Sequence, residues 1–234
     1  MTRFGCRDSK QETRVSNSAA FFRVEGTLSP RPTLTAAAWI AGNAQAMGER
    51  FARLGNVLLA APFLLGGPLH DARTGSRMAW MGLRGISEDR LHVLGEDYFE
   101  DFIKPKLRAV GVELLEQARA RGQRVVLISD NLDVIVRPLA EHLGVEDFVC
   151  NRMQIVDEEC TGELIEPVIN GNLAGEWVRS FAAENDVDLA HSYGYGAHGD
   201  DSVLLHSIGQ PCAIHPDRQL RALARDLDWP VVES

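Results

Sequence analysis

The first stretch that could carry chemistry is a short apolar run with charged and hydroxyl side chains at its end. Residues 19–24 are apolar apart from Arg23, and Glu25, Gly26 and Thr27 follow directly. This pattern predicts a buried strand that delivers these side chains to a site at its carboxyl end. The guanidinium of Arg23 is always protonated and has no free lone pair. Arg23 therefore cannot serve as a nucleophile or as a metal ligand.

Two further stretches place polar side chains where they could react. The apolar run 125–128 ends at Ser129, as expected for a strand covered on both faces, and residues 195–201 combine His198 with two carboxylates. Ser129 and His198 could be drawn as a nucleophile and its base, but the sequence identifies no oxyanion hole. A lone loop histidine is the commoner case, so we do not assign hydrolysis to this pair.

The elements that must position these residues alternate between strands and helices. Residues 33–95 show helical spacing, and 96–121 continue as helix with an interruption near Pro105. Asp130 and Asn131 are expected to cap the next helix. The alternation predicts a parallel α/β sheet. Strands are expected at 19–24, 124–129, 148–151, 189–193, 211–214 and 229–232, a hairpin at 153–165, and helices at 132–143, 174–184, 201–208 and 217–226.

With this order of elements, the stretch from Arg23 to Thr27 resembles the first motif of the haloacid dehalogenase (HAD) superfamily of phosphatases, Asp-x-Asp-x-Thr. The run 150–171 is similar to the phosphoserine-phosphatase-like branch of that superfamily. The resemblance implies that the first Asp attacks phosphorus and binds Mg²⁺, while the second protonates the leaving oxygen. In this chain Arg23 and Glu25 occupy these two places, and only Thr27 is kept.

The remaining motifs of the family are also altered. The resemblance makes Ser129 the phosphate donor of the second motif, and the place of the third-motif Lys holds Trp177. In the last motif the metal-ligand Asp falls on Ala197 and the supporting Asp on Asp201, or on Asp200 if the alignment slips by one. Since Mg²⁺ needs several hard oxygen ligands, we expect no metal ion and no other cofactor.

The resemblance implies a Rossmann-like HAD core with a parallel sheet and an inserted α-helical cap. We assign residues 19–32 plus 96–234 to the core and 33–95 to the cap. Residues 1–18 are polar and are expected to form a mobile N-terminal arm. Five arginines of the cap could receive an anionic ligand, although arginines at helical spacing usually form a solvated face. They are Arg50, Arg53, Arg73, Arg77 and Arg84.

The losses at positions 23, 25, 177 and 197 fall where the family carries its chemistry. We therefore predict a catalytically inactive pseudo-phosphatase with a binding or regulatory role toward a small anionic ligand or a protein partner. Thr27, Ser129 and Asn131 are the candidate ligand-binding residues. A buried charge needs a partner, so we expect Arg23 to take the place of the ion by bridging Glu25 and Asp201 or Asp200.

Two alternatives to the inactive protein stay open. The first is a divergent phosphate-ester hydrolase of the HAD family that uses Glu25, Ser129 and Asp201. The second is nucleotide binding through residues 194–199, because Gly194, Gly196 and Gly199 match G-x-G-x-x-G. That match is weak, since it lies near the chain end and not in a first βαβ unit.

Composition limits the partners and the location. The chain has 24 Lys and Arg against 33 Asp and Glu, a net charge of −9, which repels nucleic acid and anionic lipid. No apolar run approaches the ~20 residues of a membrane span, and no secretory signal is visible. The four cysteines show no metal-binding spacing and are expected to be reduced thiols of a cytoplasmic protein.

Overall fold

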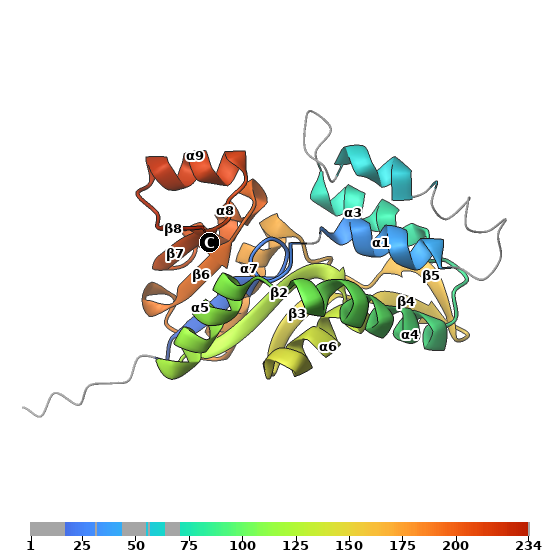
Figure 1. Ribbon diagram of the computed structural model, residues 1–234, viewed down its shortest axis with the longest axis horizontal. Coiled ribbons are helices and arrows are strands. Elements are labelled where there is room, and N and C mark those ends of the chain that lie inside the picture. Colours follow the sequence, from blue (N-terminus) through green and yellow to red (C-terminus); the bar gives the residue numbers. More distant parts are fainter. Residues whose placement is uncertain (1–16, 31, 44–54, 56, 64–70, 234) are drawn as a thin grey trace, which may run out of the picture.

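The computed structural model describes the chain apart from residues 1–16, 31, 44–54, 56, 64–70 and 234 (Figure 1). Most of the arm predicted at 1–18, and parts of the predicted cap that include two of its arginines, lie outside the described residues. Asn17 is held against the core, since its side-chain amide donates to the carbonyls of Asn185 and Asp186 at 3.0 Å each. The described part of the chain therefore begins with a residue that is hydrogen-bonded to the core.

Six parallel strands form the central sheet in the order β3-β2-β1-β6-β7-β8. β1 lies inside the sheet, where Phe21 pairs with Val126 on one side and Gly194 on the other. All five residues of β1 are buried, which accounts for its apolar run. The predicted α/β fold with a parallel sheet is confirmed. The strands are β1 (Ala19–Arg23), β2 (Arg124–Leu132), β3 (Asp147–Asn151), β6 (Tyr193–Gly196), β7 (Gln210–Ile214) and β8 (Val231–Val232).

Helices cover both faces of the sheet (Figure 1). Alternate residues of β1 point to opposite faces, so Phe22 packs with Leu115, while Phe21 packs with Val178 and Leu204. Among the described residues no helix is long and apolar enough to cross a membrane. The core helices are α5 (Ala109–Ala120), α6 (Asp133–Leu143), α7 (Gly171–Glu184), α8 (Ser202–His206) and α9 (Arg218–Asp226).

A second group of elements lies beside the sheet and combines helices with a hairpin (Figure 1). α1 (Thr33–Gly42) contacts α3 (Ala72–Met81) and α4 (Glu88–Tyr98), and α3 contacts the hairpin of β4 (Met153–Val156) and β5 (Glu159–Leu164). Main-chain hydrogen bonds attach the hairpin to the segment between α3 and α4; one of them runs from Gly85 N to Cys160 O at 2.8 Å. Segments on both sides of the core helix α5 in the sequence thus build this one group.

The helix α4 continues across the predicted boundary at residue 95. Gly95 packs directly against the main chain of Val134 in α6, so the end of α4 touches the core. A π-helix (Phe99–Ile103) and a 3₁₀ turn (Lys104–Lys106) follow, which agrees with the interruption predicted near Pro105. The chain from the helical group is therefore helical up to Lys106 and leaves the helical conformation at Leu107 and Arg108 before α5.

Two local predictions were wrong. Asp130 and Asn131 do not cap α6, because β2 continues to Leu132, which itself occupies the cap position without a side-chain hydrogen bond. The strand expected at 189–193 begins only at Tyr193. The preceding residues form a 3₁₀ turn, since the Asp188 carboxylate accepts from Ala190 N at 3.0 Å. Asp130 and Asn131 are thereby free to point toward the end of β1.

Candidate functional site

The loop after β1 closes on itself and fixes the residues that leave the strand. Val24 N donates to Ile128 O at 2.9 Å, and Gly26 N donates to Ser29 O at 2.7 Å. The hydroxyl of Thr27 donates to the carbonyl of Arg23, and Thr27 is fully buried. Thr27 was predicted to bind a ligand, but in this structure its hydroxyl holds the turn.

Gly26 is required at the tip of this loop. Its φ is +85°, a left-handed conformation that side chains rarely adopt. A methyl group there would also overlap with Ala197 and would lie 2.8 Å from Cε1 of His198. The loop after β1 therefore packs tightly against the segment that follows β6, and Ala197 lies at that contact.

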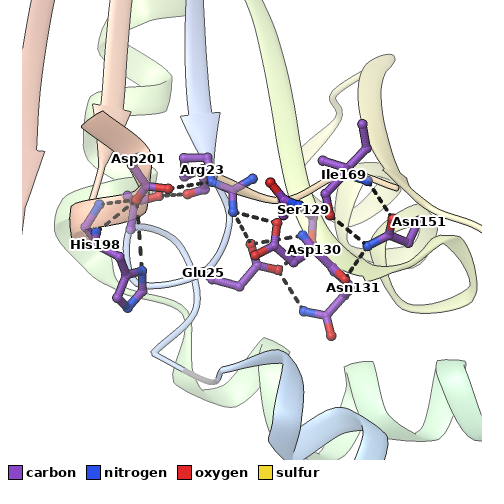
Figure 2. Close-up of polar contacts among 12 residues, drawn as sticks. Arg23, Glu25, Ser129, Asp130, Asn131, Asn151, Ile169, His198 and Asp201 are labelled. Atoms are coloured by element: carbon purple, nitrogen blue, oxygen red, sulfur yellow. Dashed lines mark hydrogen bonds and ion pairs between the residues drawn. The ribbon is translucent and has the colours of Figure 1, made fainter. Parts of the chain in front are cut away.

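Arg23 lies at the centre of a buried ion-pair cluster (Figure 2). Its Nε is 2.8 Å from Oδ1 of Asp201, and its Nη2 is 2.7 Å from Oδ1 of Asp130 and 3.7 Å from Oε2 of Glu25. The side chain of Arg23 is only 3% exposed. The predicted pairing of Arg23 with Asp201 and Glu25 is confirmed, whereas Asp130 was not predicted to bind it. Among the described residues, Nη1 of Arg23 has no hydrogen-bond partner.

Asp201 is the carboxylate from the last motif that reaches the cluster. Its Oδ2 accepts from the main-chain N–H groups of Ala197 at 2.8 Å and His198 at 2.9 Å, which leaves Oδ1 for Arg23. The imidazole Nδ1 of His198 is 4.0 Å from Oδ2 of Asp201, and the ring is half exposed. Asp200 instead packs against Gly171 at the start of α7. The choice left open by the sequence is therefore settled in favour of Asp201 as the partner of Arg23.

The carboxylate of Glu25 accepts hydrogen bonds from the end of β2 (Figure 2). Ser129 Oγ donates to Oε1 at 2.5 Å, and Asn131 Nδ2 donates to the same oxygen at 2.8 Å. The main-chain N–H of Asp130 lies 3.3 Å from Oε2. Two of the three predicted ligand-binding residues, Ser129 and Asn131, thus meet in space and bind an acidic side chain of the chain itself.

Sequence reasoning did not find Asn151, the last residue of β3. Its side-chain amide donates to the carbonyls of Asp130 at 2.8 Å and Ile169 at 3.0 Å, and its Oδ1 accepts from Ile169 N at 2.7 Å. Asn151 thereby holds the main chain that carries the cluster. The sequence did place Asn151 at the carboxyl end of a predicted strand, and this position could have marked it as a residue near the site.

The cluster contains one guanidinium and three carboxylates, so its net charge is −2 when all four are ionised. Burial lowers the pKa of Arg23, but Asp130, Asp201 and Glu25 together outweigh burial, so the pKa rises and the charge is permanent. Burial raises the pKa of Asp130 to about 6, against the opposing effect of Arg23. The net negative charge opposes the entry of the small anionic ligand that the sequence led us to expect.

These residues do not fit the Mg²⁺ ion that the resemblance implies. Magnesium takes near-octahedral oxygen ligands at about 2.0–2.1 Å. Here a guanidinium lies between the carboxylates of Asp201, Asp130 and Glu25, and Ala197 offers no oxygen on its side chain. Within the described ranges, no three His, Cys, Asp or Glu side chains form a group suited to a metal ion.

Trp177, which occupies the place of the third-motif Lys, and several other side chains make their contacts away from the cluster. Trp177 stacks on Phe181 with ring centroids 4.9 Å apart, is partly buried and packs against the core cluster that contains Val178 and Phe21. Arg179 donates to the Ser207 hydroxyl at 2.7 Å on the exposed side of α7. The described cysteines are free thiols, and burial raises the pKa of Cys150 to about 12. We therefore do not assign any of these side chains to the site.

The glycines of the G-x-G-x-x-G match do not form a phosphate-binding turn. Gly194 and Gly196 lie inside β6, where Gly194 pairs with Phe21 of β1 and Pro211 of β7. A methyl group on Gly196 would meet the Asp201 side chain at 2.8 Å. Close packing of β6 against Asp201 therefore explains this glycine without a nucleotide.

The parallel sheet brings together at one edge the charged side chains from β1, β2 and the segment after β6, and a helical group lies beside it. This is the architecture expected for a HAD-like hydrolase. The family model for haloacid dehalogenase-like hydrolases matches residues 20–206, and the chain belongs to this family. A phosphoserine phosphatase complex with bound substrate has a similar fold, with a TM-score of 0.71, 18% identity, and coverage of 94% of each chain.

Two relatives by sequence have names that point in different directions. The inhibition of morphological differentiation protein of Streptomyces azureus is 32% identical over 173 residues, which cover 73% of this chain and 62% of that protein. A phosphoserine phosphatase of Mycobacterium tuberculosis is 29% identical over 162 residues, covering 69% of this chain and 53% of that protein. The alignments thus span less than two thirds of either relative.

Proposed function

We propose that the chain is a catalytically inactive member of the HAD-like hydrolase family that acts in the cytoplasm by binding, most simply a protein partner. The observation that carries the proposal is the Arg23 guanidinium at the end of β1, 2.8 Å from Asp201 and 2.7 Å from Asp130. Phosphoryl transfer through a covalent intermediate needs a nucleophile at the reacting phosphorus. A permanently protonated guanidinium has no lone pair for that step.

The neighbouring acids do not restore the missing step. Asp201 is only 1% exposed, and its two oxygens bind Arg23 and the two amides of residues 197 and 198. Glu25 is bound by Ser129 and Asn131. Each carboxylate that could attack or transfer a proton is thus already engaged in an ion pair or hydrogen bonds. In this proposal the Arg23 guanidinium takes the structural place of the family's ion, because it neutralises part of the same acidic cluster.

The test is hydrolysis of a generic aryl phosphate by the purified protein, with and without Mg²⁺. We expect no turnover above the rate of a buffer blank. Turnover that needs Mg²⁺ and is lost in both Glu25→Ala and Ser129→Ala would overturn the proposal, because a contaminating phosphatase would not respond to these substitutions. Glu163→Ala, an exposed acid in β5, serves as the matched control.

A divergent phosphate-ester hydrolase is the second candidate. Two observations favour it: a relative is named as a phosphatase, and the end of β2 keeps the hydroxyl of Ser129 hydrogen-bonded to the carboxylate of Glu25. Asp130, with its pKa raised to about 6, would be the proton donor or acceptor in such an enzyme. This candidate predicts turnover that Asp130→Asn abolishes, whereas the inactive protein predicts no turnover to abolish.

A further inference from the structure

The hydrogen-bond donors around Glu25 form a cradle for an oxyanion, and a side chain of the protein already occupies it. We propose that Glu25 is a built-in occupant of this cradle, so that its carboxylate excludes phosphate and other small oxyanions from the site. The inference concerns the same site as the proposed function, and it adds a reason why the site does not bind an anion.

The geometry of the donors carries the inference. Ser129 Oγ at 2.5 Å, Asn131 Nδ2 at 2.8 Å and Asp130 N at 3.3 Å surround the two oxygens of one carboxylate. Nη2 of Arg23 adds a positive charge 3.7 Å from Oε2. Neutral and charged donors that converge on two oxygens are what an oxyanion requires. Glu25 itself is 4% exposed, so these donors take the place of water around its carboxylate.

A second observation indicates an unused hydrogen-bond donor on Arg23. Nη1 of Arg23 is buried and has no hydrogen-bond partner among the described residues. A buried guanidinium N–H without a partner is energetically unfavourable. Asp130, with a side chain that is 20% exposed, lies next to Arg23 and is the most exposed member of the cluster. An oxyanion that reaches the cluster would therefore meet this guanidinium donor besides the donors that Glu25 now occupies.

Charge explains why the occupant must leave before an anion can bind. With Glu25 ionised the cluster carries −2, and removal of this carboxylate reduces it to −1. Asp130 still repels an anion in that state. The substitution Asp130→Asn removes this repulsion and keeps an oxygen for Arg23. We therefore expect Glu25→Ala to open the cradle and Glu25→Ala/Asp130→Asn to bind an anion more tightly still.

The experiment measures inorganic phosphate binding to the full chain by isothermal titration calorimetry, with Tm as a second readout. Glu25→Ala is expected to bind phosphate at least tenfold more tightly than wild type, a difference in binding free energy of at least about 1.4 kcal/mol. Its Tm is expected to rise with phosphate concentration. Adding Ser129→Ala to this variant should reverse the gain, because the shortest hydrogen bond of the cradle is lost. Glu163→Ala, with the same change in charge, should show no gain.

Two further variants separate occupancy from charge and guard against misfolding. Glu25→Gln is neutral but still fills the cradle, so it should bind phosphate more weakly than Glu25→Ala. Equal binding by the two variants would overturn occupancy in favour of simple repulsion. If Glu25→Ala does not unfold cooperatively, Glu25→Ser replaces it. A folded Glu25→Ala or Glu25→Ser variant without phosphate binding overturns this inference and leaves the inactive protein standing. Turnover by wild type would overturn the proposed function and, because the aryl phosphate must then enter the site, this inference with it.

Discussion

Removing the Arg23 charge should destabilise the fold far more than removing an exposed arginine. Arg23→Met keeps most of the side-chain volume but leaves Asp201, Asp130 and Glu25 without their cation in a buried cluster. Breaking a buried ion pair by removing one partner costs about 3–5 kcal/mol. For a chain of this size each kcal/mol lowers Tm by about 2–4 °C, so we expect a fall of about 6–20 °C.

Urea denaturation followed by circular dichroism gives the free energy of unfolding of each variant. The matched control is Arg77→Met, because Arg77 pairs with Glu166 on the surface and exposed pairs contribute about 0–1 kcal/mol. Arg23→Lys should lie between wild type and Arg23→Met, since an ammonium keeps the charge but cannot bind two carboxylates through a planar fork. Lowering the pH protonates the uncompensated acids and should narrow the gap between wild type and Arg23→Met.

The result that would refute this reasoning is an Arg23→Met variant within about 1 kcal/mol of wild type, as expected for Arg77→Met. The guanidinium would then contribute no more than a surface charge, and its description as the cation that compensates the cluster would be wrong. A gap that stays constant from neutral to acid pH would show that lost packing, and not uncompensated charge, causes the destabilisation.

Two further predictions concern the partners of this cluster and the loop beside it. A carboxyl with a higher pKa in the folded state stabilises the fold while protonated, and this contribution is lost as the pH rises through the folded value. Because the pKa of Asp130 is raised to about 6, the free energy of unfolding of wild type, relative to Asp130→Asn, should fall between about pH 4 and pH 6. An unchanged difference across this window would contradict the assignment. Gly111→Ala should cost about 1–3 kcal/mol in urea denaturation, because its methyl group would overlap with the carbonyl oxygen of Thr27. A gain in stability, the usual effect of Ala in a helix, would show that this contact relaxes easily.

Much of the fold follows from local patterns. Apolar runs such as 125–128, which end in a polar residue, mark parallel strands because helices bury both of their faces. Since parallel strands share one carboxyl edge, the meeting of Arg23, Ser129 and the segment before Asp201 could be predicted from the strand order that the resemblance implies. The boundary at residue 95 could not be located in this way, because helical spacing is the same on either side of it. Residue 95 lies inside α4, and the packing of Gly95 on α6 is visible only in the tertiary structure.

The order of the residues was sufficient to show that Arg23 cannot attack phosphorus, since this property resides in the guanidinium and not in its surroundings. The sequence could not choose between Asp200 and Asp201, or show that Glu25 turns to Ser129 and Asn131. Neighbouring residues in a loop point in different directions. The hydrogen bonds of Glu25 join it to residues that lie 104 and 106 positions further along the chain, so they depend on how β1 and β2 are packed. The tertiary structure thus decided which charges neutralise one another, and therefore which hydrogen-bond donors of the site are already occupied.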